Sequence, residues 1–253
     1  MKVVVFGAAG WLGRAILNNL EAAGHQVRAV DHSAEAWSAW EDVDGPWTGE
    51  RLIADISDFA SVQAALEGMD GIVHAAVYFG QGYDDPLPWL INLKGLWNTL
   101  EGARRLGIRR IVHIGSCETV HPHGHFFSAE QRRPGGGIYP ITKRLQEEMC
   151  RSFWDAHGLP NVVLRPDYIV DSRIRMGRFR EKLGPPDHPT RNGWVCRHDL
   201  AEACRLALER DDLGFDIFHI VGTPEADATC NVARSREVLG LTYRGDLEQY
   251  RQP

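Results

Sequence analysis

The sequence predicts an α/β fold, a doubly wound parallel sheet with a small lobe built from its later residues. Short apolar runs rich in β-branched residues alternate with stretches of helical periodicity. These runs are continuously apolar, so each expected strand is covered on both faces, as in a parallel sheet. The 253 residues, 43% hydrophobic and 25% charged, suffice for one full core but not for two large domains.

The expected elements follow one another in regular order. Right-handed crossovers through the helices place helices on both faces of the sheet. The expected strands cover residues 2–6, 26–30, 51–54, 71–74, 110–114, 162–165 and 216–221. The expected helices cover residues 11–23, 59–66, 88–106, 139–157 and 198–209, with a short one near 232–239.

Two later stretches break this alternation. Residues 166–193 are rich in Arg, Pro and Gly, and residues 223–253 hold one short helical pattern and a polar tail. We therefore expect a core over residues 1–165, to which residues 194–222 return. The two irregular stretches form a small substrate-binding lobe, because both follow strands that end at the ligand-binding edge of such a sheet.

Composition argues against several classes of protein. The net charge of −6 argues against a nucleic-acid binder, because such proteins usually carry a basic surface. No apolar run is long enough to span a bilayer, and the N-terminus reads as strand, turn and helix rather than as a signal peptide. An odd number of cysteines without a C-x-x-C pair favours the reducing cytoplasm over a disulfide framework or a zinc site. These are Cys117, Cys150, Cys196, Cys204 and Cys230.

A glycine-rich turn follows the first expected strand. Glycines let backbone N–H groups approach a pyrophosphate closely, and the N-terminus of the next helix adds partial positive charge. A plain tight turn is the alternative, but the strand before it and the helix after it favour a Rossmann-type dinucleotide site. The expected pyrophosphate contacts are Gly7, Ala9, Gly10, Trp11, Leu12 and Gly13.

Acidic residues at strand ends extend this cofactor site. Asp31 follows the second strand, 18 residues beyond Gly13. A carboxylate there accepts both adenine ribose hydroxyls and repels a 2′-phosphate, so the cofactor is expected to be NAD rather than NADP. An ordinary turn acid is the alternative for Asp31. Asp55 and the segment 74–76 end the third and fourth strands at the same edge, where simple strand termination is the alternative.

A Tyr–Lys pair provides candidate catalytic groups. Tyr139 and Lys143 lie four residues apart on an expected helix, hence on one face. An ammonium beside a phenol stabilises the phenolate and makes a general base. A surface helix pair is the alternative, but this pair follows a Gly-rich stretch and a strand that ends in G-S-C.

With these motifs in this order, the chain resembles the extended short-chain dehydrogenase/reductase family of sugar epimerases, dehydratases and dehydrogenases. The matching segments are GAAGWLG, ADISD, HAA, INLKGLWNTLEGAR, GSCETV, YPITK, LRPD, RHDLAEA and FHIVG. The resemblance implies that Tyr139 is the acid/base and that Lys143 holds the nicotinamide ribose. It implies further cofactor contacts at Asp55, Ile56, Ala75, Ala76, Asn92 and Arg165.

One position departs from the family pattern. The family places a Ser or Thr hydroxyl beside the reacting carbon, and alignment puts Cys117 there, with Ser116 one residue earlier. A thiol is a weak donor, and neighbouring strand residues point to opposite faces. Either the loop shifts and Ser116 serves, or Thr119 reaches in, or Cys117 suffices. The dehydratases of the family carry an acid and a base in the next positions, whereas this chain has only Glu118 there.

The segment 171–197 predicts the class of substrate. It carries seven basic and three acidic side chains in an acidic protein. A solvated Arg-rich loop is one reading, and a clamp for a carboxylate or phosphate is the other. The short lobe resembles the uronate dehydrogenase branch, with Arg175 as the expected carboxylate ligand, although that branch has Asn and His where this chain has Glu118 and Thr119. The expected substrate contacts are Val77, Glu118, Thr119, Tyr168, Arg175 and Trp194.

We therefore expect an NAD-dependent oxidoreductase that acts on a hydroxyl or carbonyl of a small, anionic, sugar-like molecule. The alternatives are an NAD-containing nucleotide-sugar epimerase or dehydratase, and a non-catalytic NAD-sensing protein. The resemblance also implies a homodimer through the helices that bear Asn92 and Tyr139. His121, His123 and His125 alternate along one loop, but the family needs no metal and none is expected.

Overall fold

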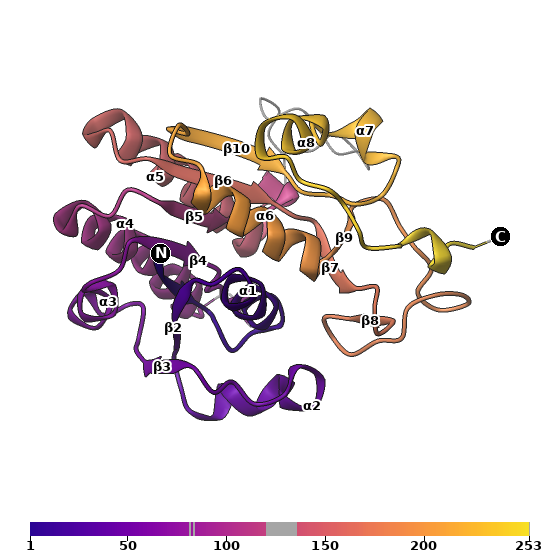
Figure 1. Ribbon diagram of the computed structural model, residues 1–253, viewed down its shortest axis with the longest axis horizontal. Helices are drawn as coiled ribbons and strands as arrows, with labels where there is room; N and C mark the ends of the chain where they lie inside the picture. Colours follow the sequence, from indigo (N-terminus) through magenta and orange to yellow (C-terminus); the bar gives the residue numbers. More distant parts are fainter. Residues whose placement is uncertain (81, 83, 120–135, 253) are drawn as a thin grey trace.

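A seven-stranded, wholly parallel sheet forms the centre of the molecule (Figure 1). The computed structural model describes residues 1–80, 82, 84–119 and 136–252. Hydrogen bonding connects the strands in the order β10-β6-β5-β4-β1-β2-β3. The strands are β1 (Lys2–Phe6), β2 (Gln26–Asp31), β3 (Glu50–Ile53), β4 (Gly71–His74), β5 (Ile111–Ile114), β6 (Asn161–Arg165) and β10 (Phe215–His219).

The direction of winding reverses between β1 and β4. The chain first adds β2 and β3 on one side of β1 and then β4, β5 and β6 on the other. In register, Val5 lies between Ala29 of β2 and Val73 of β4. Ligands of open α/β sheets bind at such a reversal, beyond the carboxyl ends of the strands. The Rossmann fold expected from the sequence is confirmed, and its switch point lies at the glycine turn after β1.

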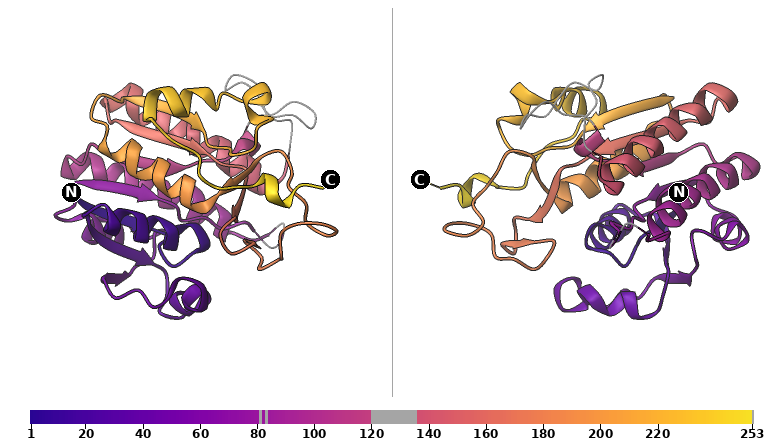
Figure 2. Two further views of the ribbon diagram at one scale, coloured as in Figure 1. Left: turned by 45° about the vertical axis from the view of Figure 1, so that its right-hand side comes forward. Right: turned by 180° about the vertical axis from the view of Figure 1, so that it is seen from behind.

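Helices cover both faces of the sheet. Helices α1 (Trp11–Ala22) and α6 (Arg197–Glu209) lie in front of it in Figure 1. Helices α3 (Phe59–Leu66), α4 (Gly95–Leu106) and α5 (Ile138–His157) come forward when the molecule is turned round (Figure 2). None of the described helices is both long and apolar enough to cross a membrane.

The strand residues divide between two cores. Val5 packs with Leu17 of α1 and Leu200 of α6, whereas its neighbour Val4 packs with Leu66 and Leu100 on the opposite face. This division follows from the alternation of side chains along a strand. Burial of each such side chain contributes about 1.5–3 kcal/mol.

A three-stranded sheet and short helices form the small lobe. The sheet joins β8 (Met176–Gly177), β7 (Tyr168–Asp171) and β9 (Trp194–Cys196) in that order. The later residues add α7 (Ala226–Thr229), α8 (Ala233–Leu239) and the 3₁₀ turn η4 (Glu248–Tyr250). The sequence predicted no strand in 166–193, yet β7 and β8 lie there, and β9 leads directly into α6.

Three further segments lie near the ligand edge. The insertion between β2 and β3 forms η1 (Glu35–Trp40) and α2 (Glu41–Asp44), which the sequence pattern did not predict. The expected helix 88–106 divides into the π-helix η2 (Pro88–Lys94) and α4, and the turn η3 (Cys117–Thr119) follows β5.

Arg197 joins the insertion to the small lobe. Its buried guanidinium donates from Nε to Asp171 of β7 at 2.7 Å and forms a double contact with Asp44 of α2 at 2.7 and 2.8 Å. It also lies 4.0 Å from the ring of Trp11, at the start of α1. Removing one partner of such a buried pair leaves an uncompensated charge. Arg197 therefore fixes three segments around the ligand edge.

Candidate active site

The glycine turn leaves no room for side chains at two of its positions. Gly7 adopts a left-handed φ of +77°, and a Cβ there would approach the backbone N of Ala76 to 2.7 Å. A Cβ on Gly13 would collide with the backbone O of Gly7. Among the described residues, no side chain caps the N-terminus of α1 at Gly10. The backbone thus forms an uncapped cradle at a helix N-terminus, which suits a pyrophosphate.

Asp31 lies directly beside this cradle. Its Oδ2 accepts the N–H of Ala9 at 2.8 Å, and its Oδ1 accepts the N–H of His32 at 2.8 Å. At the next strand end, Asp55 is exposed and accepts the N–H of Ser57, whereas Ile56 is buried against Gly95. The carboxylates expected to face the adenosine end therefore stand at the ends of β2 and β3.

Tyr139 and Lys143 lie one turn apart on α5, as their spacing predicts. The ammonium nitrogen of Lys143 is 5.9 Å from the centroid of the Tyr139 ring and donates to the carbonyl of Ile114 at 2.7 Å. Burial lowers the pKa of Lys143 to about 8, and the nearby carboxylate of Glu147 opposes this effect. Burial likewise raises the pKa of Tyr139 to about 12, and a side-chain hydrogen bond with Ser116 opposes that shift.

Ser116 and Cys117 point in different directions. The buried Ser116 hydroxyl hydrogen-bonds with Tyr139 and accepts the N–H of Glu118 at 3.0 Å. The thiol of Cys117 donates to the carbonyl of Arg165 and packs in an apolar cluster of the small lobe with Cys230. The structure thus brings Ser116, and not Cys117, to Tyr139. Thr119 donates its hydroxyl back to the Ser116 carbonyl at 2.9 Å.

Two residues expected to contact the cofactor, Asn92 and Arg165, are buried and paired with groups of the protein. Asn92 is fully buried and bonds the backbone of Tyr78 through both amide atoms at 2.8 Å. Arg165 is buried in a double ion pair with Glu147 at 2.8 and 2.5 Å. Both residues hold the surroundings of Lys143 in place, a contribution that sequence reasoning did not foresee.

An aromatic stack covers Tyr139 from the other side. Phe79, 43% exposed, stacks on Tyr139 with ring centroids 4.9 Å apart and planes inclined by 27°. The guanidinium of Arg178 lies 4.2 Å from the Phe79 ring and lowers the pKa of Tyr139 through its charge. Neither residue was singled out from the sequence; the only signal was the excess of arginine in 171–197.

The expected substrate residues are only partly assembled. Arg175 turns into the small lobe, where its Nε donates to the carbonyl of Leu183 and its guanidinium lies 5.8 Å from the Tyr250 ring. Tyr168 hydrogen-bonds Glu181, and its ring lies 6.2 Å from that of the buried Trp194. The partly buried Val77 follows Ala75 and Ala76 beyond β4. Of the arginines in 171–197, it is Arg178 that lies near Tyr139.

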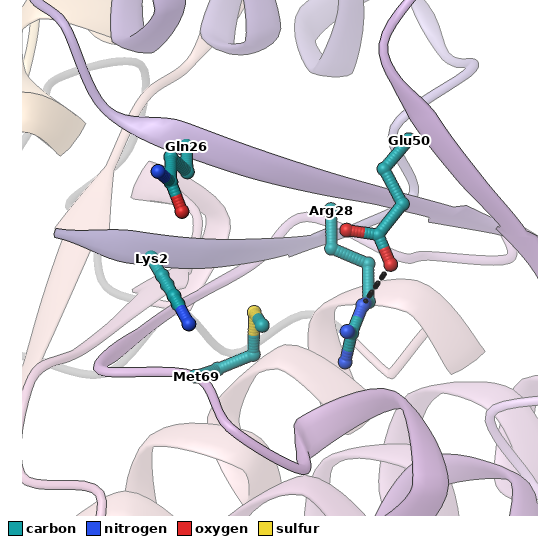
Figure 3. A pocket seen from close by; sticks show the side chains of 5 residues that line it. All are labelled: Lys2, Gln26, Arg28, Glu50 and Met69. Atoms are coloured by element: carbon teal, nitrogen blue, oxygen red, sulfur yellow. Dashed lines mark hydrogen bonds and ion pairs between the residues drawn. The ribbon is translucent and has the colours of Figure 1, made fainter.

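The rest of the described structure contains no comparable group of candidate catalytic side chains. A pocket at the beginning of β1, β2 and β3 lies at the opposite end of the sheet (Figure 3). Its Arg28 is already held by Glu50 at 2.7 Å, and by the carbonyls of Ala65 and Glu67. Within the described ranges, no three His, Cys, Asp or Glu side chains meet as a metal site would require. The histidines 121, 123 and 125 lie outside the described residues.

The fold and this site define a dinucleotide-dependent enzyme, and comparisons identify its family. Residues 3–182 match the sequence profile of the NAD dependent epimerase/dehydratase family. A uronate dehydrogenase from Pseudomonas syringae pv. tomato is 25% identical over 223 residues, which cover 86% of this chain and 73% of that protein.

Solved structures share the fold. Uronate dehydrogenase from Agrobacterium tumefaciens superposes with a TM-score of 0.74 at 23% identity, covering 98% of this chain and 86% of that chain. UDP-glucuronic acid 4-epimerase from Bacillus cereus, in complex with NAD, superposes with a TM-score of 0.78 at 17% identity, covering 99% and 96%. The chain belongs to the NAD-dependent epimerase/dehydratase family, and NAD is the cofactor of that family.

Proposed function

We propose that this enzyme is an NAD-dependent oxidoreductase that interconverts a hydroxyl and a carbonyl on a small sugar or sugar acid. The observation that carries this proposal is the convergence of Ser116, Tyr139 and Lys143 at the carboxyl edge of the sheet. The glycine cradle and Asp31 lie at the same edge, where they would hold the pyrophosphate and the adenine ribose.

Tyr139, Ser116 and Lys143 each have a separate role in the proposed proton transfer. Tyr139 as phenolate takes the proton of the substrate hydroxyl, while Ser116 donates a hydrogen bond to the same oxygen. Lys143 carries a positive charge beside the phenol, which favours the phenolate and offers an ammonium to the nicotinamide ribose. NAD, when bound, supplies the hydride acceptor. In the reverse direction Tyr139 returns the proton to the carbonyl oxygen.

Arg178 supports an anionic substrate. Its positive charge is close enough to lower the pKa of Tyr139, and its guanidinium lies over the exposed ring of Phe79. A guanidinium binds a carboxylate through two parallel hydrogen bonds. We therefore assign to Arg178 the role that the sequence suggested for Arg175. Uronic acids, which combine hydroxyls with one carboxylate, are the favoured substrate class.

The test is incubation of the purified protein with NAD and a panel of uronic acids, neutral sugars and UDP-sugars. Net NADH absorbance with the uronic acids is the expected result, together with a raised KM in Arg178→Gln. Conversion of a UDP-sugar to its epimer without net NADH would replace this proposal with the epimerase. NAD binding without conversion of any substrate would favour the sensing protein.

We also propose that two copies associate through α4 and α5. Trp97, Leu145 and Trp154 are 50%, 44% and 37% exposed on these adjacent helices, which is costly for a monomer. Light scattering should show a dimer that Trp97→Glu converts to monomers. All five cysteines are free and buried, which supports a reducing compartment such as the cytoplasm.

A further inference from the structure

A short hairpin of the small lobe, residues 176–182, is braced from within. Met176 and Lys182 pair at its base, and Gly177 donates its N–H to the carbonyl of Glu181 at 2.9 Å. The Glu181 carboxylate folds back to accept the N–H of Phe179 at 2.8 Å and the hydroxyl of Tyr168. These contacts hold the hairpin as one unit, from which Arg178 and Arg180 project to different parts of the core.

One contact of the hairpin reaches the residues around Tyr139. The guanidinium of Arg178 lies between two rings, 4.2 Å from Phe79 and 4.5 Å from Phe179. Phe79 in turn stacks on Tyr139. The hairpin is therefore connected to the proposed base through a continuous stack of planar groups.

The other contact reaches the side of the glycine turn. Arg180 forms a double ion pair with Asp42 of α2 at 2.7 and 2.9 Å, and donates to the carbonyl of Ala39 at 2.5 Å. Its guanidinium lies 4.5 Å from the Trp40 ring. Trp40 packs on Trp11, the residue after Gly10 of the cradle, with centroids 4.5 Å apart.

We propose that hairpin 176–182 is a clasp across the cofactor-binding edge of the sheet, and that the Arg180–Asp42 pair is the latch whose opening controls the release of NAD(H). One rigid hairpin contacts both the segment beside the glycine cradle and the ring stacked on Tyr139, and a dinucleotide must extend between those two places. Figure 1 shows β8 on this edge, between α2 and the rest of the small lobe. The proposal rests on the NAD site described above, but not on any particular substrate.

The latch is exposed, so it can open without disturbing a core. Arg180 and Asp42 are 44% and 62% exposed. The pair Arg210–Asp212, at the far end of α6, offers a matched control. It is 39% and 58% exposed and is also doubly bonded, and Arg210 likewise donates to a backbone carbonyl.

The experiment measures the rate of NADH release by stopped-flow fluorescence, in wild type and in Asp42→Asn, Arg180→Gln, the double variant and Arg210→Gln. Loss of an exposed ion pair alone should speed release by about 2- to 5-fold in Asp42→Asn. Arg180→Gln, which also loses the Trp40 contact, should reach about 5- to 20-fold. The double variant should release NADH no faster than Arg180→Gln, because the two residues act as one unit. Arg210→Gln should match wild type.

Salt provides a second readout. Exposed charges are screened, so rising ionic strength should speed release from wild type more than from Asp42→Asn. Release from Arg180→Gln at the rates of wild type and Arg210→Gln would overturn the clasp while leaving the proposed function intact. Failure of wild type to bind NADH would overturn both. Normal release kinetics without turnover of any sugar would count against the proposed function alone.

Discussion

The cofactor side and the substrate side of the proposed site are built by different means. The cofactor side is made of backbone, since Gly7 and Gly13 bring their chain so close to neighbouring segments that a single Cβ does not fit. The substrate side is made of long side chains, with Arg178 of the small lobe lying over the exposed ring of Phe79. Backbone contacts permit one arrangement, whereas side-chain contacts permit many. We therefore propose that the core binds the cofactor and carries the chemistry, and that the lobe selects the substrate.

The largest effect is expected at the residue that lies between these two sides. Tyr139→Phe removes the proposed acid/base and should lower kcat by about 10²- to 10⁴-fold. NADH affinity, measured by fluorescence titration, should stay within about twofold of wild type, because the Tyr139 hydroxyl is not part of the glycine cradle. A Tyr139→Phe variant with full turnover would show that chemistry does not depend on this residue.

The backbone side is tested by Gly13→Ala. The added methyl collides with the carbonyl of Gly7, and overpacking of this kind costs about 1–3 kcal/mol. We expect that loss in the free energy of unfolding, measured with urea, and weaker NAD binding. Gly136→Ala is the control, since a Cβ there meets nothing within 4 Å. Equal NAD affinity in the two variants would contradict a tight backbone cradle.

Ser116 and Cys117 are neighbours in the chain but have different surroundings: Ser116 hydrogen-bonds with Tyr139, whereas Cys117 packs in an apolar cluster. Ser116→Ala should lower kcat about tenfold, because it loses one hydrogen bond to the reacting oxygen. Cys117→Ala should leave kcat within about twofold and instead lower the free energy of unfolding by about 1 kcal/mol, as expected for a small buried cavity. If Cys117→Ala lowered kcat and Ser116→Ala did not, the assignment would be reversed.

A further effect concerns stability. Burial lowers the pKa of Lys143 from its ordinary value of 10.5 to about 8. Between these values the unfolded chain binds a proton that the folded chain lacks, so the free energy of unfolding rises with pH. Lys143→Met should be more stable than wild type by about 3 kcal/mol at pH 7, and this advantage should disappear above pH 10.5. Urea titrations at several pH values give the comparison, and a pH-independent difference would contradict the buried ammonium.

The same contrast explains what could be predicted from the sequence. Continuous apolar runs predicted the seven strands of the main sheet, and the spacing of Tyr139 and Lys143 predicted their common helix face. The segments η1 and α2 were missed because Trp37 packs into a core cluster built from distant parts of the chain, with Arg14 and Arg51 near its ring. Such long-range contacts leave no local pattern.

The sequence also could not show whether Arg175 or Arg178 lies near Tyr139. Arg175 and Arg180 adopt left-handed φ values of +58° and +65°, which side-chain-bearing residues seldom take. These two turns redirect Arg175 into the lobe and leave Arg178 over Phe79. The direction of each Cβ thus follows from backbone geometry that the composition of 171–197 does not encode.

The most direct test of the central claim follows one hydrogen atom. A uronic acid deuterated at the carbon that bears the reacting hydroxyl is incubated with NAD and the enzyme, and the mass of both products is measured. The account predicts deuterium in free NADH, in amounts equal to the oxidised sugar acid. Deuterium returned to the sugar carbon, with no labelled NADH released, would contradict it.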